Sequence, residues 1–135
     1  MTEADIKNKN LVLISYLNSI ITDYKIKAEY STNENDTKVI VVKETSGEKV
    51  VFFDNDVPLF NYYDIEIFGD SIEDAKNTSV IVGNLIGKHV FLDYGKNQRW
   101  QLIFKQFSNP RTIEYMDIRR IAYTSTLKCV VNRIA

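Results

Sequence analysis

The stretch NPRTIEYMDIRRIAYTSTLKCVVN, from Asn109 to Asn132, carries the longest strand pattern of the chain. It begins with Asn-Pro, a pair that favours a turn. After Arg120, apolar and polar residues alternate with the period of a β-strand that buries one face. We therefore predict a long final strand, and we expect the turn at 108–111 to end the strand before it.

The same period predicts further strands upstream. They cover 25–31, 38–44, 48–54, 62–69, 89–94 and 99–107. Thr45-Ser46-Gly47 favours a tight hairpin between 38–44 and 48–54, because Gly can adopt the positive φ that such a turn needs. Within 62–69, Ile65 and Ile67 alternate with Asp64 and Glu66, so we expect these two carboxylates on a solvated strand face.

Two segments have helical periodicity instead. The first runs from Thr2 to Tyr24, and the second from Asp70 to Gly87, where Asp70 and Ser71 can cap its start. We expect its inward stripe to consist of Ile72, Ala75, Ser79, Val82 and Ile86. The predicted fold is α+β, with a mostly antiparallel sheet, an N-terminal helix and a second helix packed on one face.

Length and charge set the broad class. The 135 residues, 44% of them hydrophobic, predict a single soluble domain spanning 1–135. A net charge of -1 provides no general attraction to phosphate backbones or anionic lipid. The N-terminus lacks a signal-peptide pattern, and no window is apolar enough to span a membrane. We expect the single cysteine, Cys129, to be buried and inert.

The sequence contains no recognisable catalytic set. His89 is the only histidine, so neither a His-based nucleophile pair nor a zinc cluster can be assembled. The glycines form no phosphate-binding loop. We predict no catalytic residue, no cofactor and no metal, and hence no enzyme. An alternative is a small metal-dependent nuclease that uses Asp54, Asp56, Asp64 and Glu66.

The stretch YDIEIFGDSIEDAKNTSVIVGNLI, from Tyr63 to Ile86, resembles the centre of tail terminator and related minor tail proteins of long-tailed bacteriophages. In that group an alternating strand runs into a Gly/Asp-capped helix. The closing stretch 109–132 is similar to the C-terminal part of the same proteins. The resemblance implies a homo-oligomeric ring, a hexamer in the well-studied cases, that caps the tail tube and meets the head connector.

That ring implies partners and a location. The partners are further copies of the chain, the tail tube protein and the head connector, while DNA passes through without specific binding and no membrane is involved. The location is the head–tail junction of the virion, after assembly in the host cytoplasm. Within this reading the alternatives are a head–tail connector, a minor capsid protein or a baseplate component.

Two groups of residues receive roles in the ring. We predict that Arg111, Arg119 and Arg120 lie at the subunit interface, because an arginine fork can bind a carboxylate of a neighbouring subunit. We expect acidic residues in the lumen, since basic ones would bind the phosphates of passing DNA. These lumen residues are Glu34, Asp36, Asp54 and Asp56.

Overall fold

The computed structural model describes residues 3–28, 37–45, 60–116 and 120–135, which form two helices and six strands. In chain order they are α1 (Glu3–Ile20), β1 (Lys25–Lys27), β2 (Val39–Thr45), β3 (Phe60–Phe68), α2 (Ile72–Gly83), β4 (His89–Asp93), β5 (Arg99–Tyr115) and β6 (Arg120–Arg133). The α+β class predicted from the sequence is confirmed.

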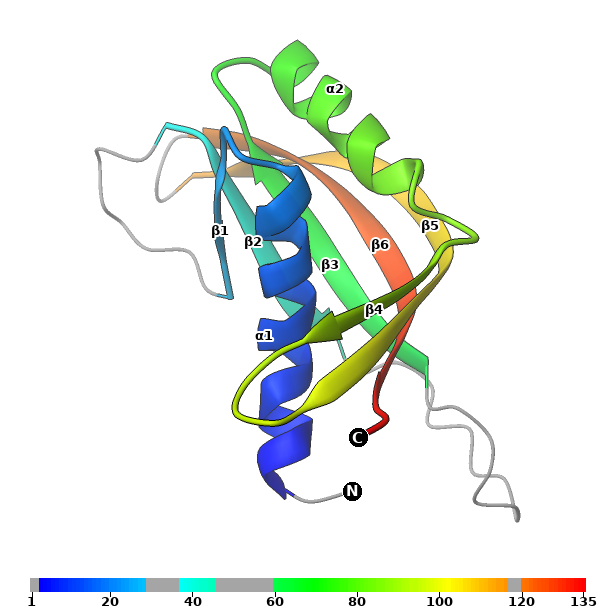
Figure 1. The fold of residues 1–135 in the computed structure, drawn as a ribbon. Coiled ribbons are helices and arrows are strands. Elements are labelled where there is room, and N and C mark those ends of the chain that lie inside the picture. Colours follow the sequence, from blue (N-terminus) through cyan, green and yellow to red (C-terminus); the bar gives the residue numbers. More distant parts are fainter. Residues whose placement is uncertain (1–2, 29–36, 46–59, 117–119) are drawn as a thin grey trace.

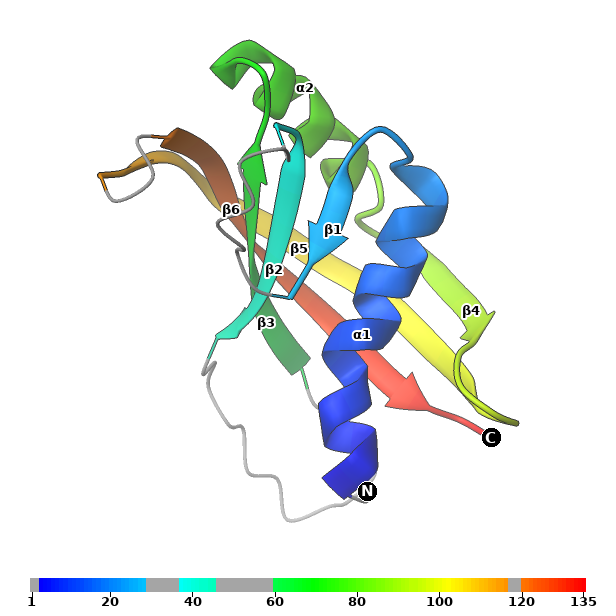
Figure 2. The same ribbon diagram turned by 90° about the vertical axis from the view of Figure 1, so that its left-hand side faces the viewer.

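The strands form one mixed sheet in the order β1-β2-β3-β6-β5-β4. β1 is parallel to β2, and every other pair of neighbours is antiparallel. The sheet curls around α1, and α2 lies across one end of it (Figures 1 and 2). Of the predicted hairpin, 38–44 is observed as β2, between β1 and β3, whereas 48–54 lies outside the described residues.

α1 packs one face into the hollow of the sheet. Leu13 and Leu17 are fully buried there, as the helical period predicts. The helix ends at Ile20, earlier than expected, with a last backbone bond from the Ile21 N–H to the Leu17 carbonyl at 2.8 Å. Consecutive β-branched residues at 20–22 favour extended structure, and the chain enters β1 at Lys25. Tyr24 is buried, but it lies beyond the helix.

α2 begins where the capping pattern places it. Ser71 is the N-cap, and its hydroxyl accepts a bond from the Asp74 N–H at 3.1 Å. The helix ends at Gly83 instead of Gly87, because Gly and Asn are poor helix formers and Asn84 serves as its C-cap. The following turn changes the phase of the side chains. Leu85 is therefore buried, and the inward position predicted for Ile86 is wrong, since Ile86 is 37% exposed.

The different burial of Leu85 and Ile86 can be tested with a pair of alanine variants. Leu85→Ala should lower the free energy of unfolding by about 2–5 kcal/mol, the usual cost of removing a buried leucine. Ile86→Ala is the matched control and should cost less than about 1 kcal/mol, because its side chain already contacts water. Urea denaturation followed by circular dichroism measures both. A larger loss for Ile86→Ala would mean that residues 84–87 continue the helix.

β5 does not stop at Pro110, so the predicted turn at 108–111 is wrong. The strand continues to Tyr115 and pairs with β6 over its whole length, with register shifts after Phe104 and after Ser108. At the second shift Asn109 adopts a φ of 57°. Proline lacks an N–H but is tolerated in a bulge. The Asn-Pro pair therefore bends the long strand without ending it.

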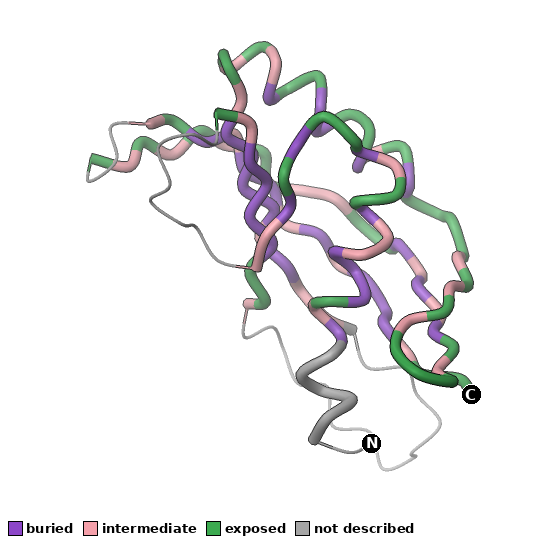
Figure 3. Tube along the Cα trace, turned by 60° about the vertical axis from the view of Figure 1, so that its left-hand side comes forward, coloured by how far each residue is buried: buried purple, intermediate pink, exposed green. Residues whose placement is uncertain are grey.

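The two faces of the sheet have separate cores. On the face that carries the helices, α1 and α2 pack on apolar residues of all the strands, including Trp100, Phe104 and Cys129. Burial raises the pKa of the Cys129 thiol to about 12, so the thiol stays protonated and inert, as expected. The opposite face, here called the outer face, has a smaller core of Val39, Val41, Phe68 and Ala122 beside Tyr115. Buried residues concentrate along the central strands (Figure 3).

Candidate functional site

The outer face carries a row of charged side chains beside its apolar core. Arg111, one of the predicted interface residues, lies on β5 with its guanidinium 3.6 Å from the Asp64 carboxylate of β3. It also donates to the Asn109 carbonyl at 2.9 Å. Asp64 accepts a further bond from the Thr126 hydroxyl at 3.1 Å. Arg111 therefore joins strands of its own subunit.

Glu66 is the buried member of this row. The prediction that it lies on a solvated face is wrong, because Glu66 is only 5% exposed. Its carboxylate accepts a hydrogen bond from the Tyr115 hydroxyl and lies 3.4 Å from the Lys43 ammonium. A carboxylate can be buried when such partners replace its water shell. Burial, followed by the bond to Glu66, raises the pKa of Tyr115 well above its ordinary value.

Tyr115 and Arg120 fix the hairpin formed by the ends of β5 and β6. The Tyr115 ring lies 5.7 Å from the Phe68 ring, and the Arg120 guanidinium lies 5.2 Å above that same ring. Arg120 also donates to the carbonyls of Thr37 and Gly69, the latter at 3.5 Å. The structure therefore places Arg120 against its own subunit. Arg119 lies outside the described residues.

A second polar cluster joins the start of α2 to the segment between α1 and β1 and to the residue that precedes β2. The Tyr24 hydroxyl donates to the Asp74 carboxylate at 2.8 Å, and the Lys38 ammonium lies 3.5 Å from the same carboxylate and 3.6 Å from Asp23. The Asp70 N–H adds a bond to Asp74 at 3.3 Å. We call Tyr24, Lys38 and Asp74 the α2 junction.

The pKa values in the α2 junction are shifted by these contacts. The bond from Tyr24, followed by the Asp70 N–H and the Lys38 charge, lowers the pKa of Asp74. Burial raises the pKa of Tyr24 to about 12, with a further contribution from Asp74. The stabilising effect of Asp74 is thus present above the pKa of an unfolded aspartate and is lost as the pH falls through its lower folded value.

The remaining predicted site residues are only partly described. Glu34, Asp36, Asp54 and Asp56 lie outside the described residues. Of the alternative nuclease set, Asp64 and Glu66 have the cationic partners described above. Among residues 3–28, 37–45, 60–116 and 120–135, no group of three or more His, Cys, Asp or Glu side chains could hold a metal ion.

The adjoining ends of β5 and β6 carry exposed apolar side chains. In Figure 2 these ends project from the side of the molecule away from α1 and β4. Met116 is 75% exposed directly after β5, and Ile121 is 46% exposed on the opposite strand. We call residues 111–116 and 120–123 the arm. The alternating pattern predicted a strand over 120–123 but not over 111–116, and it could not show that the strands extend past the helices that would cover them.

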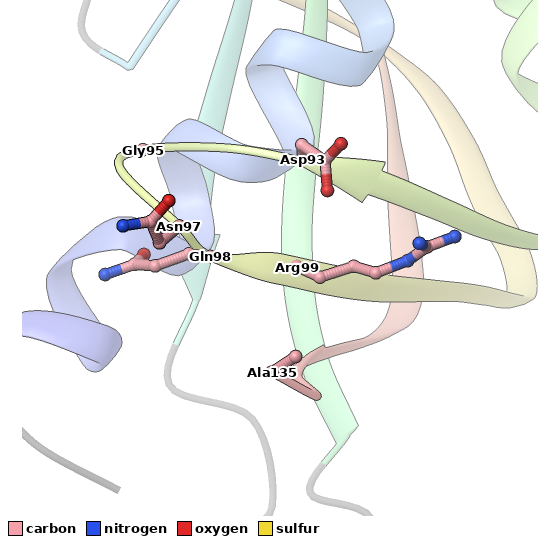
Figure 4. Close-up of a pocket in the computed structure, with 6 residues that line it drawn as sticks. All are labelled: Asp93, Gly95, Asn97, Gln98, Arg99 and Ala135. Carbon is pink, nitrogen blue, oxygen red and sulfur yellow. The ribbon is translucent and has the colours of Figure 1, made fainter.

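A polar hollow of about 370 Å³ lies at the turn between β4 and β5. Asp93, Gly95, Asn97, Gln98, Arg99 and Ala135 line it (Figure 4). None of the predicted site residues contributes to it. Asp93 and Arg99 come from the paired ends of β4 and β5, so their closeness depends on a strand register that the sequence alone does not specify.

No protein-family model matches the chain, and neither a curated protein nor a solved structure matches it. None of the described helices is long and apolar enough to cross a membrane.

Proposed function

We propose that this protein is a structural virion subunit, a tail terminator that assembles into a ring, caps the tail tube and joins it to the head connector. The observation that supports the proposal most is the arm, which combines rigid anchoring with an exposed apolar tip. The sequence resemblance over 63–86 and 109–132 also supports the proposal, and the sheet-rich α+β fold is compatible with it.

The arm has the properties of an assembly element. Its base is held by the bond from Tyr115 to the buried Glu66 and by Arg120 on the Phe68 ring. A preordered element loses little conformational entropy when it binds. Its tip presents Met116, and methionine is enriched at the cores of protein interfaces. An isolated subunit gains nothing from exposing such a side chain, whereas a neighbouring subunit can bury it.

The interface arginines receive different roles. Arg120 and Arg111 stabilise the arm within the subunit through the contacts described above. Arg119 directly precedes Arg120 in the sequence, and we propose that it binds a carboxylate of the neighbouring subunit or of the tail tube protein. The passing DNA makes no specific contact.

The test separates assembly from folding. Arg119→Ala should weaken ring assembly by about 2–5 kcal/mol per interface, because the partner carboxylate is left desolvated, while the melting temperature of the subunit stays nearly constant. Light scattering, in the presence and absence of tail tubes, measures assembly, and thermal unfolding measures the subunit. Arg120→Ala is the matched control and should lower the melting temperature.

Two results would count against the proposal. A wild-type chain that stays monomeric at high concentration, even with assembled tail tubes, would contradict the ring. Unchanged assembly and infectivity in Arg119→Ala would contradict the role of that arginine alone.

A further inference from the structure

β4 ends the sheet on one side and has an open edge. It is the last strand in the sheet order and pairs only with β5, from His89 opposite Ile103 to Asp93 opposite Arg99. No other described strand lies along its second edge, and Figure 2 shows β4 at the margin of the sheet. α1 lies mainly against β1, β2 and β6.

The backbone groups on the open edge can be assigned from the ladder. The backbone N–H of Tyr94 donates to the Gln98 carbonyl at 3.1 Å, and the backbone N–H of Phe104 donates to the Lys88 carbonyl at 3.1 Å. Bonded and non-bonded positions alternate along an antiparallel pair, so Val90 and Leu92 bond to β5. The N–H and C=O groups of His89, Phe91 and Asp93 therefore point away from β5, toward the open edge.

The side chains of these three residues are open to solvent, and two of them have no polar partner among the described residues. His89, Phe91 and Asp93 are all exposed, and Phe91 is 52% exposed with the Arg99 guanidinium 5.9 Å above its ring. Neither His89 nor Asp93 makes a side-chain hydrogen bond or ion pair with any described residue. Natural edge strands are usually protected by lysine, proline or a bulge, and residues 89–93 contain no lysine or proline.

We propose that β4 pairs with β4 of a second copy of this chain, antiparallel and centred on Phe91, so that the two sheets become continuous across a twofold axis. The sequence His-Val-Phe-Leu-Asp is self-complementary in this register. His89 lies opposite Asp93 of the partner subunit, and Val90 lies opposite the partner's Leu92. An imidazole N–H then meets a carboxylate on the outer face, and apolar side chains meet on the helix face.

Neighbouring registers are less favourable. A shift by two residues in one direction places His89 opposite Phe91 of the partner subunit and Asp93 opposite a glycine. The opposite shift places Phe91 opposite the partner's Asp93 and His89 opposite a glycine. Either shift loses both symmetric His–Asp pairs, and a shift by one residue would place apolar and polar side chains on the wrong faces.

This contact is independent of the proposed ring. A twofold contact is isologous and closes as a dimer, whereas a ring needs a heterologous contact made by two different surfaces. In Figure 2 the arm projects on the left of the molecule and β4 lies at its right margin, so one contact does not block the other. Because a short edge pairing buries little surface, the dimer should be weak and concentration-dependent.

Disulfide trapping tests the register directly. Phe91→Cys should form a disulfide-linked dimer under mild oxidation, because the two central residues of an antiparallel pair lie about 5.5 Å apart at Cα, within disulfide range. Val80→Cys, with 57% exposure on α2, is the matched control and should stay unlinked. Cys129 is fully buried and does not interfere. Equal linking of the two variants would overturn the proposal.

Sedimentation equilibrium tests the charge pair. The wild-type chain should populate a species of twice 15.6 kDa, and His89→Glu should raise its dissociation constant at least about tenfold by placing like charges opposite each other. The double variant His89→Glu/Asp93→Lys should restore the wild-type value. A monomeric wild type, or a dimer that His89→Glu leaves unchanged, would overturn the proposal. If the chain forms a six-subunit ring but Phe91→Cys forms no disulfide-linked dimer, the result would support the proposed function and exclude the β4 contact.

Discussion

Phe104→Ala should lower the free energy of unfolding by about 3–5 kcal/mol, a large part of the 5–15 kcal/mol that stabilises a typical domain. Phe104 is fully buried, and its ring centroid lies 5.7 Å from that of Tyr16 on α1. The truncation leaves a cavity between α1 and β5. Because the curled sheet holds α1 on several sides, the site cannot collapse to fill that cavity.

The backbone of Phe104 adds a second reason for the size of this effect. Its carbonyl accepts the Gly87 N–H at 2.8 Å, and its own N–H bonds to Lys88, so it anchors the turn between α2 and β4. A register shift follows it directly. Urea denaturation should show a lower midpoint, with an intermediate value for Phe104→Leu. Phe91→Ala is the control in dilute solution and should cost less than about 1 kcal/mol; an equal loss would contradict the packing of Phe104 against α1.

Local patterns predicted the parts of the fold that local physics determines. The Ser71 cap follows from short-range hydrogen bonding, and the burial of Leu13, Leu17 and Cys129 follows from periodicity. The predicted inward position of Ile86 was wrong because Gly83 and Asn84 end the helix early. The turn that follows places Leu85 in the core instead. A periodicity argument assumes that the helix continues, so it cannot detect such a change of phase.

The longer-range contacts could not be predicted from one sequence. Alternation places Glu66 on the face opposite Ile65, but its burial depends on Tyr115, which is 49 residues away and reaches it only because β5 continues past Pro110. Arg120 likewise contacts Thr37, 83 residues away. Such pairings depend on strand order and on the position of bulges, and many registers are compatible with the same alternation.

Contacts between distant parts of the chain also separate the roles of Arg119 and Arg120. Successive side chains of a strand point to opposite faces, so the neighbours Arg119 and Arg120, both predicted at the subunit interface, are expected to face opposite sides of the sheet. Arg120 takes the supporting role through the Gly69 carbonyl and the Phe68 ring. The outward role proposed for Arg119 stays a prediction. Arg119→Ala and Arg120→Ala therefore test the two roles separately: the first should weaken assembly, and the second should lower the melting temperature of the subunit.

Gly69→Ala should destabilise the subunit by about 1–3 kcal/mol, because it overpacks the α2 junction. A Cβ at residue 69 would lie 2.7 Å from the Tyr24 hydroxyl oxygen and 2.9 Å from an Asp74 carboxylate oxygen. It would also lie 3.1 Å from the backbone nitrogen of Ala75. The two side chains can rotate away only by giving up their mutual hydrogen bond, and the backbone contact requires α2 itself to shift.

A double-mutant cycle with Tyr24→Phe separates these contributions. Removing the hydroxyl eliminates the shortest contact and the bond to Asp74, so Gly69→Ala should cost less in the Tyr24→Phe background, with a coupling of about 0.5–3 kcal/mol. Gly83→Ala is the matched control. A Cβ at residue 83 would meet only the Phe107 ring, at 3.7 Å, so the same exchange should be neutral or stabilising by up to about 1 kcal/mol. If Gly69→Ala costs the same in both backgrounds, the destabilisation comes from the shift of α2 alone, and the hydrogen bond between Tyr24 and Asp74 contributes nothing to it.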